Sequence, residues 1–299
     1  MLYDQQLQLI NFIQRFRTPL LDQLFKFLNF FDRQEFFFVL IPIIWLGQGW
    51  KTGLRLFYIL FFSSLANHAL KELFLSPRPF HLDANIGIIQ VSGLGFPSGA
   101  AQTALFLGGL LCIFWKSSWK WVLALAYILL VSFSRIYLGI HFPSDILGGW
   151  LVGFGLLAIY LYARPPIERQ LKRLNPLSLF LLSQIVPVLL LIWQSSLRTS
   201  SVAMGIGIGV FIVHSYQLFL PSPKHTKEYV LRATVGVLGT FACYTLMSLL
   251  PISHSIFYLI PRFLVLGLWI SLGSHLVCLK LFPDCKSFRD GLIEKKPLV

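Results

Sequence analysis

The chain has 299 residues, of which 56% are hydrophobic and 12% are charged. Soluble domains usually carry about 25% charged residues, so this composition excludes a soluble globular enzyme and a disordered chain and is typical of a polytopic membrane protein. The formal net charge is +13, but the basic residues lie in short loops between apolar segments, as topology signals do, and we expect no nucleic-acid partner.

The first predicted element is amphipathic. Between residues 5 and 31, apolar side chains recur at steps of three and four, with charged side chains between them. This pattern predicts a helix that lies in the membrane interface and is broken near Pro19. The alternative is a true membrane span. We assign residues 1–34 to this interfacial segment.

Nine apolar segments follow. A spanning helix needs about 20 mostly apolar residues, and helices are the backbone form that satisfies such runs in lipid. We therefore predict an all-α polytopic helical bundle with about nine transmembrane helices. The segments are 36–49, 53–73, 98–115, 119–138, 145–163, 176–194, 201–220, 229–250 and 256–282.

Lys and Arg gather in alternate loops. They are frequent near residues 51–55, 116–120, 164–173 and 224–232 and in the tail after 280. The positive-inside rule makes these loops cytoplasmic, so the intervening loops 74–97, 139–144, 195–200 and 251–255 face outward.

A basic, proline-containing stretch divides the predicted bundle. We interpret residues 164–175 as a cytoplasmic linker between two transmembrane modules. The expected front module covers residues 35–163, and the expected rear module of four helices covers residues 176–299. The rear module carries no chemical motif that indicates a role.

Polar residues that could bind a ligand or take part in catalysis lie at the outward ends of the front helices. Lys71 and Arg78 lie in KELFLSPRP, and Ser98 opens the next span in FPSGA. Fixed cations and a helix N-terminus together favour an anion such as phosphate. Downstream, the segment SRIYLGIHFPSD carries His141, which can attack phosphorus if Asp145, four residues on, orients its other nitrogen.

These three clusters resemble the signature of the type-2 phosphatidic acid phosphatases, K-x6-R-P, P-S-G-H and S-R-x5-H-x3-D, over roughly residues 50–163. The resemblance implies a histidine nucleophile, His141, that forms a phosphohistidine and is oriented by Asp145. It implies no metal or other cofactor. The groups that it implies for holding the phosphoryl oxygens are Lys71, Arg78, Ser98, Gly99 and Arg135.

One position departs from the signature, because Ala100 stands where the family has the histidine that protonates the leaving group. A general acid is typically worth about 10²–10⁴ in rate. One explanation is a diphosphate substrate, whose leaving group needs less help. A second is replacement by His81 or Asp83, which lie in the outward loop just after Arg78. A third is a chain that binds its ligand without cleaving it, or an exchange made to trap a substrate.

The residues and the resemblance together predict a phosphatase that acts on a lipid phosphate or diphosphate, such as a polyprenyl diphosphate. We expect it in a bacterial inner membrane, with the site facing outward and with membrane lipids and the lipid substrate as its partners. The alternatives are a lipid phosphotransferase and a catalytically disabled lipid-binding relative. Soluble haloperoxidases share such a pocket, but the membrane spans make that class remote.

Overall fold

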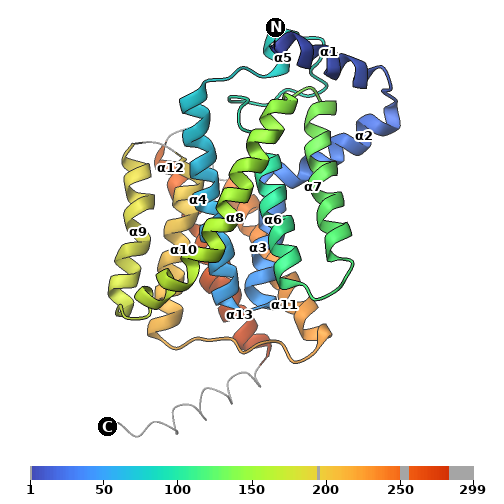
Figure 1. Ribbon diagram of the computed structural model, residues 1–299. Helices are drawn as coiled ribbons and strands as arrows, with labels where there is room; N and C mark the ends of the chain where they lie inside the picture. Colours follow the sequence, from blue (N-terminus) through green and yellow to red (C-terminus); the bar gives the residue numbers. More distant parts are fainter. Residues whose placement is uncertain (1, 194–195, 250–255, 283–299) are drawn as a thin grey trace, which may run out of the picture. The chain divides into compact units, whose positions relative to one another are not determined.

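The computed structural model describes residues 2–193, 196–249 and 256–282, and every regular element in these ranges is helical (Figure 1). Each of the nine predicted apolar segments contains a helix. The outward loop 251–255 and the end of the basic tail lie outside the described residues. The helices are α1 (Leu2–Gln14), α2 (Pro19–Leu28), the 3₁₀ helix η1 (Asn29–Asp32), α3 (Gln34–Gly47), α4 (Trp50–Phe74), α5 (Pro79–Leu82), α6 (Gly99–Phe114), α7 (Lys120–Tyr137), α8 (Pro143–Leu171), α9 (Pro176–Ile192), α10 (Leu197–Ser215), α11 (Thr226–Leu249), α12 (Ile256–Leu268), the π-helix η2 (Trp269–Gly273) and α13 (Ser274–Leu281).

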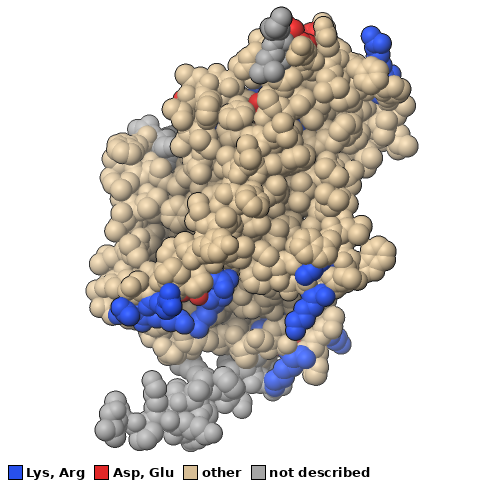
Figure 2. Space-filling model, viewed as in Figure 1, with Lys and Arg blue, Asp and Glu red and all other residues tan. Residues whose placement is uncertain are grey.

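The length and composition of the helices make this an integral membrane protein. In the described residues, five stretches are long and apolar enough to cross a membrane, namely α7, α8, α10, α11 and the run from Tyr258 to Leu281. The helices α3, α6 and α9 are apolar but shorter. Uncharged side chains cover most of the face shown in Figure 2. The count of nine spans stays a prediction.

The contacts divide the chain into two compact units. Unit 1 consists of Met1–Phe36 and Phe62–Glu168, and unit 2 of Phe37–Phe61 and Arg169–Val299. The sequence places residues 35–61 in the front module, whereas the contacts group 37–61 with the C-terminal residues. Within unit 2, α3 approaches α11, where a Cβ at Gly236 would lie 2.7 Å from Leu46.

Most of the expected linker at 164–175 is helical, because α8 continues to Leu171. Its role as a boundary between two modules stays a prediction. Proline lacks an N–H and usually ends a helix, but Pro165 and Pro166 lie inside this one. Side-chain contacts join the turns on either side of the prolines. Arg164 pairs with Glu168 at 3.7 Å and donates to the Tyr160 hydroxyl at 3.1 Å.

The N-terminal helices of unit 1 pack against the end of α7. The chain breaks before α2, where Thr18 caps the helix and Pro19 occupies its first position, as the sequence predicts. Phe25 and Leu28 are buried in a cluster with Tyr137 and neighbouring residues, and α2 lies beside α7 in Figure 1. Residues 2–32 therefore cover the end of unit 1 at which the sequence motifs meet. Their position in a membrane interface stays a prediction.

Candidate active site

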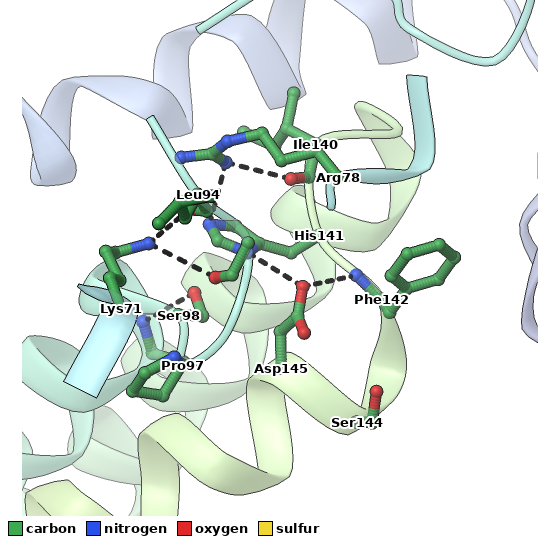
Figure 3. A network of polar contacts seen from close by, with 12 residues as sticks. Lys71, Arg78, Leu94, Pro97, Ser98, Ile140, His141, Phe142, Ser144 and Asp145 are labelled. Atoms are coloured by element: carbon green, nitrogen blue, oxygen red, sulfur yellow. Dashed lines mark hydrogen bonds and ion pairs between the residues drawn. The ribbon is translucent and has the colours of Figure 1, made fainter. Parts of the chain in front are cut away.

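Four helix ends in unit 1 carry the motif residues to one place. Lys71 lies in the last turn of α4, Ser98 caps the start of α6, and Arg135 lies in the last turn of α7. Asp145 lies in the first turn of α8, and His141 lies in the short connection before it. Figure 3 shows Lys71, Arg78, Ser98, His141 and Asp145 gathered around this point.

His141 is held through one ring nitrogen and contacted at the other. Its Nδ1 lies 3.1 Å from Oδ2 of Asp145, and the same oxygen accepts the N–H of Phe142 at 2.9 Å. Nη1 of Arg78 lies 3.2 Å from Nε2 of His141. A guanidinium group can only donate, so Nε2 accepts and the ring proton resides on Nδ1, which donates to Asp145. Nε2 is therefore the unprotonated nitrogen, and in this structure Arg78 occupies its lone pair.

The surroundings keep the imidazole neutral. Burial lowers the pKa of His141 well below its usual value of 6.5, and the charges of Arg78, Lys71 and Arg135 act in the same direction. The side chain is 3% exposed. A neutral ring retains the lone pair that a nucleophile needs at neutral pH.

Lys71 and Arg78 are fixed by carbonyl groups of the loop that precedes α6. Lys71 donates to the carbonyl oxygens of Leu94 at 2.5 Å and Gly95 at 3.2 Å. Arg78 donates from Nε to the Gly93 oxygen at 2.7 Å and from Nη1 to the Ile140 oxygen at 2.9 Å. Both cations are thus oriented by backbone before any ligand arrives, which reduces the entropy lost on binding.

The start of α6 is built against α8. The N–H of Ser98 donates to the carbonyl oxygen of Asp145 at 2.9 Å, and its Oγ accepts from the N–H of Ala101 at 3.4 Å. The N–H groups of a first helical turn lack acceptors within the helix, so those of Gly99 and Ala100 are suited to an anion. A Cβ at Gly99 would lie 3.2 Å from Oδ1 of Asn67.

A buried polar chain that we did not single out from the sequence joins α4 to α6. Asn67 donates to the Pro97 oxygen at 3.3 Å and to Oε1 of Gln102 at 2.9 Å, and Gln102 donates to the Ser63 hydroxyl at 2.7 Å. These contacts set the position of Ser98 relative to Lys71. The signal that would find them is the presence of uncharged polar residues inside apolar spans.

Arg135 points toward the N-terminal segment. It is fully buried and donates to Oδ1 of Asn29 at 2.5 Å, to the Leu28 oxygen at 3.1 Å and to the Ser134 hydroxyl at 3.1 Å. It also contacts Oδ2 of Asp32 at 3.4 Å. Its charge reaches His141, and a direct contact with phosphate stays a prediction. Sequence reasoning missed Asn29 and Asp32, because they lie about a hundred residues before Arg135.

The remaining predicted residues have local contacts. Ala100 is buried in an apolar cluster. Nδ1 of His81 accepts the N–H of Arg78 at 3.2 Å and so caps α5. Oδ1 of Asp83 accepts the N–H of Asn85 at 3.0 Å. The hypothesis that His81 or Asp83 protonates the leaving group stays a prediction, and these contacts give it no support.

A buried histidine that is held by a carboxylate and contacted by Arg78, with Lys71 and the start of α6 nearby, is an arrangement suited to binding an anion. Residues 52–169 match the PAP2 superfamily. Phosphatidylglycerophosphatase B of Bacillus subtilis is 30% identical over 158 residues, covering 48% of this chain and 75% of that protein. The chain belongs to the PAP2 superfamily, the type-2 phosphatidic acid phosphatases.

Other relatives match the same half of the chain. Undecaprenyl-diphosphatase of Sulfolobus acidocaldarius is 26% identical over 170 residues, covering 54% of this chain and 79% of that protein. Among solved structures, Aquifex aeolicus LpxE matches with a TM-score of 0.47 at 25% identity, covering 52% of this chain and 93% of its own.

Proposed function

We propose that this chain is a membrane phosphatase that releases phosphate from a lipid phosphate or diphosphate through a phosphohistidine at His141. The observation that carries the proposal is the placement of the two ring nitrogens, one on Asp145 and the other beside Arg78. The names of the relatives support a lipid substrate, since they include an undecaprenyl-diphosphatase, a phosphatidylglycerophosphatase and a lipid A 4'-phosphatase.

The first step is an in-line displacement at the terminal phosphorus. The Nε2 lone pair of His141 forms the P–N bond while the bond from phosphorus to the leaving oxygen breaks, and the bonding pair goes to that oxygen. Asp145 stabilises the positive charge that develops on the ring. Lys71, Arg78 and the first-turn amides of α6 hold the three phosphoryl oxygens, on which negative charge is spread.

The second step returns the enzyme to its starting state. Water attacks phosphorus, the P–N bond breaks, and its electron pair returns to Nε2. Inorganic phosphate leaves, and the excess proton passes to solvent or to a basic group of the site. A lipid hydroxyl in place of water would make the protein a phosphotransferase, so the acceptor decides between these two activities.

We place the site at the outer face of a bacterial cytoplasmic membrane. Two features support this placement. The site lies at the ends of α4, α6, α7 and α8 that the sequence assigns to outward loops, and the loops at the other ends are rich in Lys and Arg. A substrate with long tails would then reach the site from the surrounding lipid.

The test is phosphate release by the purified protein in detergent. The substrates are a polyprenyl diphosphate and a phosphatidic acid, each radiolabelled in the terminal phosphate, and the comparison is with His141→Ala. We expect phosphate release and a protein-bound label that is stable to alkali and labile to acid, both lost in the variant. Binding without release would overturn the proposal in favour of a lipid-binding relative, and label in a lipid acceptor would favour a phosphotransferase.

A further inference from the structure

We propose that Asp32 is the general acid that protonates the leaving group in this site, a role for which position 100 offers no titratable side chain. The inference rests on the proposed phosphatase activity and adds a catalytic residue to it. It comes from the contacts of η1 with the site, in a segment that precedes the region matched to the superfamily.

Asp32 is brought to the cations of the site by Arg135. Its Oδ2 lies 3.4 Å from Nη1 of Arg135, whose neighbouring donors hold Asn29 and Leu28 of the same segment. The charges of Arg78 and Lys71 also act on the Asp32 carboxyl group. The Asp32 carboxyl group is thus within electrostatic reach of the same cations that act on His141.

The side chain of Asp32 is partly open to the outside, although the protein desolvates its carboxyl group. Its side chain keeps 41% of its surface exposed, whereas that of Arg135 keeps none. Burial nevertheless raises the pKa of Asp32 above its usual value of 3.8, against the pull of Arg135, Arg78 and Lys71. Because the side chain remains partly open, a substrate can reach it. A phosphorylated ligand brings further negative charge, which favours the protonated acid.

The packing around Ala100 involves the segment that carries Asp32. Ala100 packs with Ala104 and Val131, and Phe31 and Tyr127 lie against this cluster. Phe31 directly precedes Asp32, and its ring centroid lies 5.2 Å from that of Tyr127. The segment that carries Asp32 therefore packs against the cluster that contains position 100.

The other carboxylate among the cations is already engaged. Lys71 and Arg78 also act on Asp145, but Oδ2 of Asp145 accepts from both His141 and Phe142. An ionised group committed to the nucleophile cannot also donate a proton to the leaving group. Asp32 is bound to a cation on one side and open on the other.

The proton balance closes over the two steps. As the bond from phosphorus to the leaving oxygen breaks, that oxygen takes the proton of the Asp32 carboxyl group, and Arg135 stabilises the resulting carboxylate. In the second step the Asp32 carboxylate takes a proton from the attacking water. Asp32 ends protonated, and Nε2 of His141 regains its lone pair.

The test compares leaving groups in Asp32→Asn, which keeps the size of the side chain and an acceptor for Arg135. An alkoxide leaving group, as in phosphatidic acid, needs a proton, whereas p-nitrophenolate does not. We expect kcat on phosphatidic acid to fall about 10²–10⁴-fold, with p-nitrophenyl phosphate hydrolysis close to that of the unaltered protein. The variant Asp32→Glu, which keeps a carboxyl group, should retain much of the phosphatidic acid turnover that Asp32→Asn loses.

The controls separate the acid from its surroundings. Asp4→Asn removes an exposed carboxylate in the first turn of α1. Tyr127→Phe removes a hydroxyl group that could itself donate a proton, from a residue that packs against the Ala100 cluster. Equal losses on both substrates would overturn the proposal, as would unchanged turnover in Asp32→Asn or the selective loss in Tyr127→Phe instead. Absence of phosphate release from both substrates by the unaltered protein would instead overturn the phosphatase function itself.

Discussion

Nη1 of Arg78 lies 3.2 Å from Nε2 of His141, so the nitrogen proposed as the nucleophile is hydrogen-bonded to a cation before any substrate is present. This contact fixes the tautomer of the ring, because the guanidinium group donates hydrogen bonds and cannot accept one. It also places a permanent positive charge at the point where the phosphoryl group would enter. Orientation of the nucleophile and attraction of the anion therefore depend on the same residue.

Replacement of Asp145 by Asn should remove the control of the tautomer. The amide can donate from its NH₂ group to Nδ1 of His141, which would move the ring proton to Nε2. Nε2 would then have no lone pair for nucleophilic attack. We expect kcat to fall about 10³–10⁴-fold with a small change in KM. The matched control is Glu168→Gln, since Glu168 pairs with Arg164 near the other end of α8. A variant that retains more than a tenth of the activity would contradict the assignment.

The pH dependence of the reaction should follow the lowered pKa of His141. Because burial and neighbouring cations lower this pKa below 6.5, the ring stays neutral as the pH falls through 6.5 and is protonated only under more acidic conditions. The acid limb of kcat/KM should therefore lie below pH 6.5. The position of the acid limb is checked by measuring rates in detergent from about pH 4 to 8, roughly the range in which histidines titrate. An acid limb at or above the usual histidine value would show that the nucleophile is not buried among cations.

Protonation of His141 should also affect folding. A buried ring whose pKa is lowered resists protonation in the folded state, while the unfolded chain takes up the proton near pH 6.5. Stability is therefore lost as the pH falls below that value. Thermal unfolding in detergent at several pH values measures the effect, and His141→Gln should weaken it.

The contact between α6 and α8 offers a test of positioning. A Cβ at Gly149 would lie 2.5 Å from the Ser98 oxygen, whereas a Cβ at Gly155 in the same helix meets no atom within 4 Å. Gly149→Ala should push the start of α6 away from Asp145 and lower kcat at least tenfold, because such displacements near a reacting group are costly. Gly155→Ala should leave activity unchanged. Equal activity of the two variants would show that α6 and α8 can separate without loss.

The bonds from Arg135 to the N-terminal segment should contribute to stability. Arg135→Ala leaves Asn29 and the Leu28 carbonyl without their donor, and a buried acceptor left without a partner costs about 1–3 kcal/mol. We expect a lower unfolding temperature and faster proteolysis before residue 34. Arg17→Ala, which breaks a more exposed pair with Asp22, should have a smaller effect. The reverse order would contradict this role for Arg135.

The local parts of the site could be predicted from the sequence, and the long-range parts could not. Apolar runs predicted the helices, and motif spacing predicted that His141 and Asp145 meet, because they are four residues apart. The polar chain through Asn67 and Gln102 leaves no spacing pattern, since its members lie on different helices. The same holds for Asp32, which reaches Arg135 only through the packing of η1 against α7.

The packing around Ala100 limits which side chains this position can accept. The residue is 2% exposed and lies in a cluster against which Phe31 and Tyr127 pack, so an imidazole inserted here would overfill the space and destabilise the fold by about 1–3 kcal/mol. A bulkier side chain at position 100 would therefore need a smaller residue at one of the surrounding positions. Redesign of this part of the site thus calls for paired exchanges, with the compensating one in the N-terminal segment or in α7.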